Sequence, residues 1–167
     1  MALTPNQEQT NYKTFVHIEQ VMRLLAAMQL ELGRRMFTHD RSKLAAPELQ
    51  MFEEVTKNLE GLTYGSAEYM AQLEAMKQTA LPHHYAHNRH HPEHFPMGVS
   101  GMNLIDVLEM VCDWQAACMR HADGDIHKSL EINRDRFGLS DQLVDIIENT
   151  LPLLADPYEG LETQADL

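Results

Sequence analysis

The stretch that decides the fold spans residues 102–121 and reads MNLIDVLEMVCDWQAACMRH. Ile105, Leu108 and Cys112 recur at intervals of three and four positions, which is the spacing of residues on one face of an α-helix. A glycine precedes the stretch, and the turn-forming sequence ADGD (residues 122–125) follows it. The pattern therefore predicts one long helix with an apolar seam.

The same periodicity covers most of the chain, and no segment shows the clean alternation expected of a strand. We expect further helices over about 12–36, 47–59 and 66–80, a short one after residue 125, and a last one over 140–151. The first of these has one apolar stripe of Phe15, Ile18, Met22, Leu25 and Leu32, beside a second of His17, Val21, Leu24 and Met28. The sequence thus predicts an all-α protein, with a single compact domain of five to seven helices over residues 12–155, a flexible N-terminus (1–11) and an acidic C-terminal tail (156–167).

The length and the net charge of the chain limit the classes of function that it can have. At 167 residues the chain has the size of one domain. Its formal net charge of −12 argues against non-specific nucleic-acid binding, which needs a basic surface. No apolar run approaches the ~18 residues of a membrane span, and the first residues lack the apolar core of a signal peptide. We therefore expect a cytoplasmic protein with no membrane segment.

Six of the ten histidines fall between residues 83 and 94, in the stretch LPHHYAHNRHHPEHF (residues 81–95). Histidine is the commonest metal ligand and titrates near neutral pH, so the cluster suggests a metal or a proton. Pro92 biases the preceding residue out of the helical region, which splits the histidines between a helix end and a loop. Glu93 lies among them as a candidate general base or ligand. The alternative is a set of exposed histidines with no shared target.

Two further groups of residues have the character of ligands. In the sequence HDRSK (residues 39–43), His39 and Asp40 offer two ligand types to one cation, and Lys43 lies close enough to meet a phosphate. In the 102–121 helix, three acids recur on one face: Asp106, Glu109 and Asp113. Like charges at this spacing repel one another unless a cation or a basic group lies among them. A solvated acidic face is the alternative. His17 is either a core histidine or a further ligand.

The order His, His-Asp, His cluster and late Asp on a helical chain resembles the HD superfamily of metal-dependent phosphohydrolases. This resemblance implies an HD-like fold and a core ligand set of His17, His39, Asp40 and Asp113, with Asp106 as the rival for the last place. It implies added ligands from His84, His90, His91 and His94. Residues 12–150 also resemble a family of short uncharacterised bacterial and phage proteins, through HDRSK, YGSAEY, HHYAHNRHHPEHF, MNLIDVLEMVCDW and DGDIHKSLEINRDRFG.

The resemblance to the HD superfamily implies hydrolysis of a nucleotide or another small phosphate ester by metal-activated water. One or two divalent ions (Mn, Fe, Zn, Co or Mg) would be the cofactor. Lys43 and Arg89 would neutralise charge on the phosphate, and Glu93 or Glu109 would take or relay the proton of the water.

Two other functions stay open at this point. All-α nucleoside-triphosphate pyrophosphatases of the MazG type hold magnesium with acidic pairs, which Glu53-Glu54 and Glu109 with Asp113 resemble. A non-catalytic helical module with a structural metal is the second alternative. A homo-oligomer is possible in each case.

Overall fold

The computed structural model describes residues 3–59, 67–68, 71, 74–75, 80–120 and 124–154. This part of the chain contains α-helices and short 3₁₀ helices and no strand, which confirms the all-α class. Its six α-helices fall within the predicted number and are α1 (Pro5–Thr38), α2 (Glu48–Leu59), α4 (Ala80–His87), α5 (Leu104–Met119), α6 (Ile126–Phe137) and α7 (Asp141–Thr150). The 3₁₀ helices are η1 (Arg41–Leu44), η2 (Pro92–His94), η3 (Gly98–Gly101) and η4 (Leu151–Leu154).

Capping residues explain where the helices begin. Thr4 and Gln7 form a capping box at the start of α1, with Pro5 as the first helical residue, so the helix begins seven residues before the predicted Tyr12. Residues 5–11, predicted to be flexible, therefore belong to α1. Ser140 caps α7 as predicted. Most of the helix expected over 66–80, and the C-terminal tail, lie outside the described residues.

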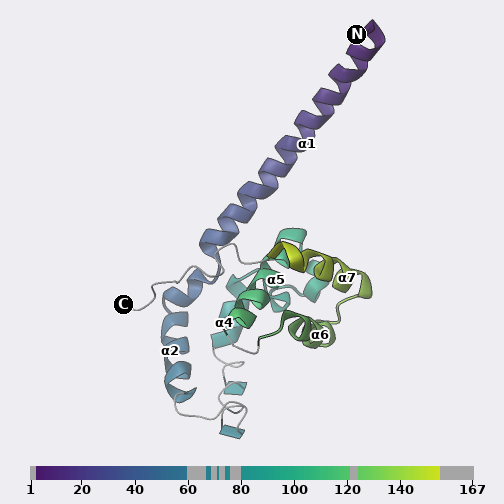
Figure 1. The fold of residues 1–167 in the computed structure, drawn as a ribbon. Coiled ribbons are helices and arrows are strands. Elements are labelled where there is room, and N and C mark those ends of the chain that lie inside the picture. Colours follow the sequence, from purple (N-terminus) through teal and green to yellow (C-terminus); the bar gives the residue numbers. More distant parts are fainter. Residues whose placement is uncertain are drawn as a thin grey trace.

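The apolar core lies between α5, α6 and α7. Its buried members are Met110, Val111, Leu130, Leu139 and Ile147. The predicted seam of Ile105, Leu108 and Cys112 is therefore not the buried face of α5, and Cys112 is exposed. Helix α5 turns Met110 and Val111 toward α6 and α7 because those helices cover only that side of it (Figure 1). Leu108 and Cys112 of this seam instead line a groove beside the C-terminal end of α1.

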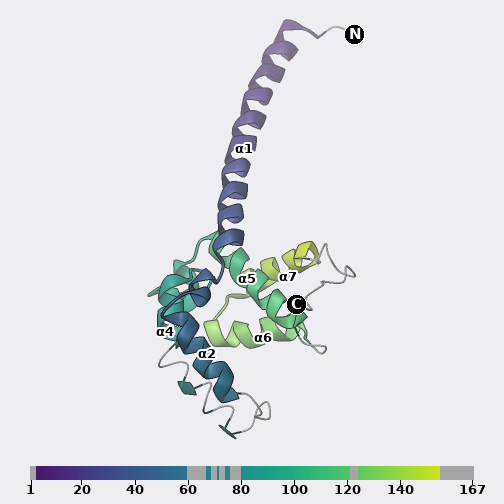
Figure 2. The same cartoon turned by 90° about the vertical axis from the view of Figure 1, so that its left-hand side faces the viewer.

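Helix α1 projects from this body as a long rod (Figures 1 and 2). It has no buried residue, although its sequence predicted two apolar stripes on an inward face. Phe15 is 69% exposed and Leu25 is 64% exposed. Only the last turns of α1 meet the body. Among the described residues, no helix combines the length and the apolar character needed to cross a membrane.

An ionic network fixes α1 to α5. The guanidinium of Arg35, in the last turn of α1, lies 2.8 Å from Asp106 Oδ1 and 2.8 Å from Glu109 Oε2. Arg89 also donates to Asp106, at 2.8 Å. Asp106 is fully buried and accepts the backbone N–H of Asn103, which closes the capping box of α5. Burial raises the pKa of Asp106, but the hydrogen bonds from Arg89, Asn103 and Arg35 outweigh it, so the pKa lies below its usual value of 3.8.

We expect Asp106→Asn to lower the free energy of unfolding by about 3 kcal/mol, because it removes the buried counter-charge that Arg35 and Arg89 share. The measurement is urea unfolding at pH 7, with the exposed Asp135→Asn as the matched control. Since the pKa of Asp106 is depressed in the folded state, this stabilisation is present above pH 4 and is lost as the pH falls below it. A variant as stable as the control would contradict the role given to Asp106.

Candidate metal centre

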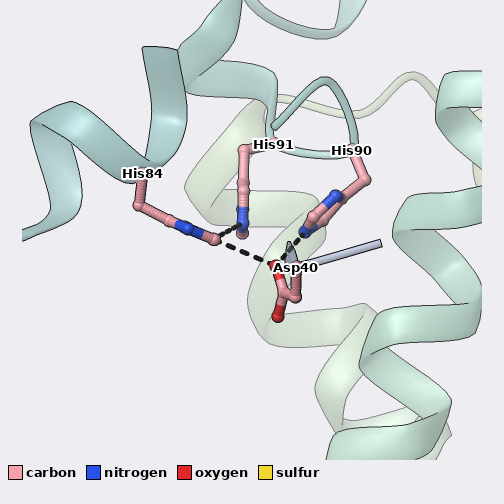
Figure 3. A group of neighbouring side chains, drawn as sticks. All are labelled: Asp40, His84, His90 and His91. Atoms are coloured by element: carbon pink, nitrogen blue, oxygen red, sulfur yellow. Dashed lines mark hydrogen bonds and ion pairs between the residues drawn. The ribbon is translucent and has the colours of Figure 1, made fainter. Parts of the chain in front are cut away.

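The candidate centre lies where the end of α1, η1, α4, the loop after α4 and α5 meet. His39 follows the last residue of α1, and Asp40 forms the turn into η1 with a left-handed backbone (φ 55°). Aspartate is one of the few residues that adopt this conformation at low cost. The turn directs the Asp40 carboxylate toward three histidines, His84, His90 and His91, as Figure 3 shows.

The ligand atoms converge within short distances. His84 Nε2 lies 3.3 Å from Asp40 Oδ1 and 2.9 Å from His91 Nε2. His90 Nε2 lies 3.5 Å from the same Asp40 oxygen. On the other side of Asp40, His39 Nε2 lies 3.7 Å from Asp40 Oδ2 and 3.5 Å from Asp113 Oδ1. These spacings leave room for an ion between the atoms but not for another side chain.

Two overlapping groups of four residues emerge. The inner group is Asp40, His84, His90 and His91, and the outer group is His39, Asp40, His90 and Asp113. Within each group, the ligand atoms all lie within 4.8 Å of one another. Both groups contain Asp40, and a carboxylate with its two oxygens is suited to bridge a pair of ions. Nitrogen and carboxylate ligands suit zinc, iron, manganese or cobalt better than calcium.

Two buried polar atoms in this region have no hydrogen-bond partner: Asp40 Oδ1 and His90 Nε2. Buried polar atoms in folded proteins are nearly always paired, so an unpaired atom needs a specific explanation. The two atoms lie 3.5 Å apart, and both ligand groups include Asp40 and His90. A cation coordinated at this point would satisfy both of them.

Carboxylates hold the far side of three of the histidine rings. His84 Nδ1 lies 2.9 Å from Glu48 Oε2, His39 Nδ1 lies 3.0 Å from Glu109 Oε1, and His90 Nδ1 lies 3.3 Å from the same Glu109 oxygen. A metal-binding histidine typically donates its second ring N–H to a carboxylate in this way, which fixes the tautomer and turns Nε2 toward the metal. This arrangement is the second feature that favours a metal centre.

The electrostatics of the cluster are dominated by its carboxylates. Hydrogen bonds to Asp113 and Glu109, together with the charge of Asp40, raise the pKa of His39 to about 10 in spite of its partial burial. Burial opposes ionisation of Asp40, but the neighbouring His84 and Lys43 favour its charged form, outweigh the burial and hold the pKa of Asp40 well below its usual range. Burial and the neighbouring His90 and His84 lower the pKa of His91 to about 3, so His91 is neutral. The carboxylates are therefore negatively charged and would attract a cation. His91 is neutral, so its ring nitrogen could act as a metal ligand.

The centre is closed on one side and open on the other. His84 and His90 are buried, whereas the side chains of His39, Asp40 and Asp113 are 31%, 23% and 28% exposed. The open side leads into a groove of about 680 Å³ between α1 and α5. Its walls combine His39, Glu109 and Asp113 with the apolar residues Leu32, Met36, Leu108, Cys112, Ala116 and Leu154.

Not every predicted site residue belongs to the centre. His17 lies on the exposed length of α1, 22 residues and roughly 33 Å before His39, so the structure does not bring it to the centre. Asp106 is bound by Arg35 and Arg89 and belongs to neither ligand group, whereas its rival Asp113 belongs to the outer group. His94 belongs to neither group, because its Nδ1 lies 2.8 Å from the carbonyl oxygen of Tyr85.

Of the four predicted catalytic residues, two lie beside the centre and two are paired elsewhere. Lys43 Nζ lies 2.6 Å from Asp40 Oδ2, at the edge of the centre. Arg89 is held by Asp106, and Glu93 pairs with Arg136 at 2.8 Å on the surface, so neither is directed at the ligand groups. Glu109 lies behind His39 and His90 and has a positioning role there.

Sequence reasoning missed three residues that support the histidines. Glu48 is fully buried and contacts His83, His84 and the hydroxyl of Ser42. Asn88 donates to the same hydroxyl at 2.8 Å and to the carbonyl oxygen of His84 at 2.8 Å. Glu48 follows Pro47 at the start of a helix, where a glutamate is usually exposed to solvent. The local sequence therefore gave no sign that Glu48 is buried beside the histidines.

The fold and the site together define an all-α protein with a candidate metal centre built from histidine and aspartate. Within that class, the chain belongs to the family of unknown function DUF5662, whose pattern matches residues 6–153. This confirms the resemblance to a family of uncharacterised proteins. Searches of curated proteins and of solved structures returned no match.

We expect the purified, tag-free protein to bind a divalent metal stoichiometrically, measured by elemental analysis and by titration calorimetry. Asp40→Asn keeps the left-handed turn but removes a ligand charge from both groups, so it should weaken binding more than about 100-fold, beyond the range typical of supporting residues. Asp113→Asn alters only the outer group and should retain binding at the inner one. Asp40→Asn with undiminished metal content would contradict the assignment. Glu93→Gln is the matched control.

The supporting carboxylate offers a separate test. Glu48→Gln keeps the size of the side chain but removes the charge that orients His84, and we expect metal affinity to fall about 10- to 100-fold. Glu53→Gln, on the exposed face of the same helix, is the control. Equal affinities of the two variants in calorimetry would show that His84 does not depend on Glu48.

Proposed function

We propose that the protein is a divalent-metal-dependent hydrolase of a small phosphate ester, with nucleotides as the first substrates to consider. The observation that carries the proposal is the pair of ligand groups sharing Asp40, with the unpaired Asp40 Oδ1 and His90 Nε2 between them, at a site open to solvent on one side. A metal with exposed ligands keeps coordination positions free, which is the mark of a catalytic rather than a structural site.

The residues divide by role. His84, His90 and His91 form the buried side that would hold the ion, and Asp40 spans both groups. A divalent cation bound there supplies Lewis-acid polarisation of a phosphoryl oxygen and activation of water. His39 and Asp113 line the open side, where a substrate would approach. Of the two carboxylates in these groups, Asp113 is the more exposed and lines the groove, so it is placed to accept a proton there.

Lys43 is the residue best placed to recognise the phosphate. Its ammonium lies beside Asp40 and above the ring of Phe52, 5.3 Å from the centroid. The side chain is 37% exposed, so it has the freedom to turn toward an incoming anion. An anionic substrate needs such local positive charge in a chain with a net charge of −12. Arg89 is less free to turn, because it donates through two nitrogens to both oxygens of the buried Asp106.

The resemblance to the HD superfamily supports this proposal only in part. The His-Asp pair, the middle histidines and the late aspartate converge, but His17 does not take the place of the first histidine. The relation to that superfamily therefore stays a prediction that rests on the order of the motifs.

The two alternatives account for less of the geometry. A MazG-type pyrophosphatase would use Glu53 and Glu54, but both are exposed on α2, Glu53 pairs with Lys57, and the ligand groups found in the described residues include neither. A structural metal module favours a closed site, often with cysteine. In the described residues, neither ligand group contains a cysteine, and the outer group is open.

The test is phosphate release from a panel of nucleotides and small phosphomonoesters by the manganese- or zinc-loaded protein. We expect Lys43→Ala to lower kcat/KM at least about 10-fold with unchanged metal content, because it removes phosphate recognition and no ligand. Lys57→Ala is the matched control on α2. Full metal occupancy without release from any member of the panel would favour the non-catalytic module instead.

A further inference from the structure

The apolar stripe of α1 repeats with the period of a coiled coil. Successive positions 15, 18, 22, 25, 29, 32 and 36 alternate in steps of three and four, and they hold Phe, Ile, Met, Leu, Gln, Leu and Met. This is the seam along which two helices pack side by side, with a single polar residue at Gln29. Two pairs of oppositely charged residues lie off the seam and bind each other along α1: Glu19 with Arg23, and Glu31 with Arg34.

Within the described residues, nothing covers most of this seam. A dozen large apolar side chains of α1 between Tyr12 and Phe37 are 36% to 70% exposed, and five of them lie on the seam: Phe15, Ile18, Met22, Leu25 and Met36. Single proteins in solution rarely expose contiguous apolar patches of more than a few hundred Å². A row of this length offers area on the order of the 800 Å² per partner that a stable interface buries. The exposed seam therefore has the size of a dimer interface.

The lower end of the seam continues into the groove beside the metal centre. Leu32 and Met36 of α1 face Leu108, Cys112 and Ala116 of α5 across it. Gly33 lies on this wall, and a Cβ atom added there would meet nothing within 4 Å. Glycine inside a helix costs about 1 kcal/mol relative to alanine, and no contact in the described residues accounts for it here. Close approach of a helix from outside the chain would account for it.

We propose that the occupant of the seam and the groove is helix α1 of a second copy, packed antiparallel. The seam is complementary to itself, which a twofold dimer requires, since both copies then use the same surface. In the antiparallel arrangement, the N-terminal half of each α1 lies on the partner's C-terminal half and extends into the partner's groove. This half of the helix projects away from the other helices that the structure describes (Figure 2). The otherwise uncovered half of the helix thereby gains an apolar surface.

This pairing has a consequence for the metal centre. His39, Glu109 and Asp113 line the same groove as Leu32 and Met36. A helix seated in the groove would shield the outer ligand group from solvent on that side. The centre of one copy would then be bounded by the helix of the other. The inference stands on the apolar seam and does not depend on the proposed hydrolase activity.

The first test is the mass of the full chain in solution by light scattering at about 10–100 μM. We expect the mass of two 19.1 kDa chains for the wild type. Leu25→Glu places a charge on the seam and should weaken association at least about 100-fold, with unchanged helicity and metal content, because Leu25 is exposed in the single chain. Gln20→Glu adds the same charge to the opposite face and should remain dimeric. A monomeric wild type, or a fully dimeric Leu25→Glu variant, would overturn the proposal.

The orientation is tested by the distance between two spin labels. The labels are attached at Thr10→Cys in a variant whose Cys112 and Cys118 are replaced by serine. At 1.5 Å per residue, antiparallel helices that cross near Leu25 place the labels roughly 40–50 Å apart. Parallel helices place them within about 20 Å. The short distance would overturn the antiparallel arrangement, and the long one supports it.

Discussion

The structure depends above all on the position of one guanidinium group. Arg35 binds Asp106 and Glu109 at once, and it does so with a side chain that is only 15% exposed. Without it, two acids on one face of α5 would repel each other at the junction with α1. With it, the end of α1 is fixed to α5, and the second oxygen of Glu109 is free to meet His39 and His90. The ion pair between Arg35 and Glu109 thus holds the carboxylate that orients His39 and His90, although neither Arg35 nor Glu109 belongs to the ligand groups.

Helix α5 serves two environments through its two sides. One side contributes Met110 and Val111 to a small apolar core with α6 and α7. The other contributes Glu109 and Asp113 to a cluster of carboxylates and histidines. The second side has little apolar burial to stabilise it and concentrates negative charge. A cation bound there would also stabilise the fold, because only the folded chain brings Asp40 and Asp113 next to the histidines of the 83–94 stretch.

The long helix α1 connects the candidate centre with the proposed dimer. Its last turn supplies Arg35 and leads into His39 and Asp40, while the rest of its length presents an apolar seam to solvent. The same helix therefore lines the groove beside the centre at one end and projects from the body along the rest of its length (Figure 2), where we place the proposed dimer surface. An antiparallel partner would couple the two, since its helix would occupy the groove into which the outer ligand group opens.

The sequence by itself determined the helical class, most helix positions and the principal ligand candidates, because these follow from periodicity, capping residues and residue chemistry within a few positions. His39, Asp40, the histidine cluster and Asp113 were all identified this way. The tertiary structure decided which of them meet. It excluded His17, gave Asp106 to two arginines, and recruited Glu48 from a distant helix. The local sequence around each residue does not predict these contacts, because the role of a charged group depends on the partners that folding brings next to it. It likewise does not reveal whether an amphipathic helix buries its seam in its own body or leaves it for another chain.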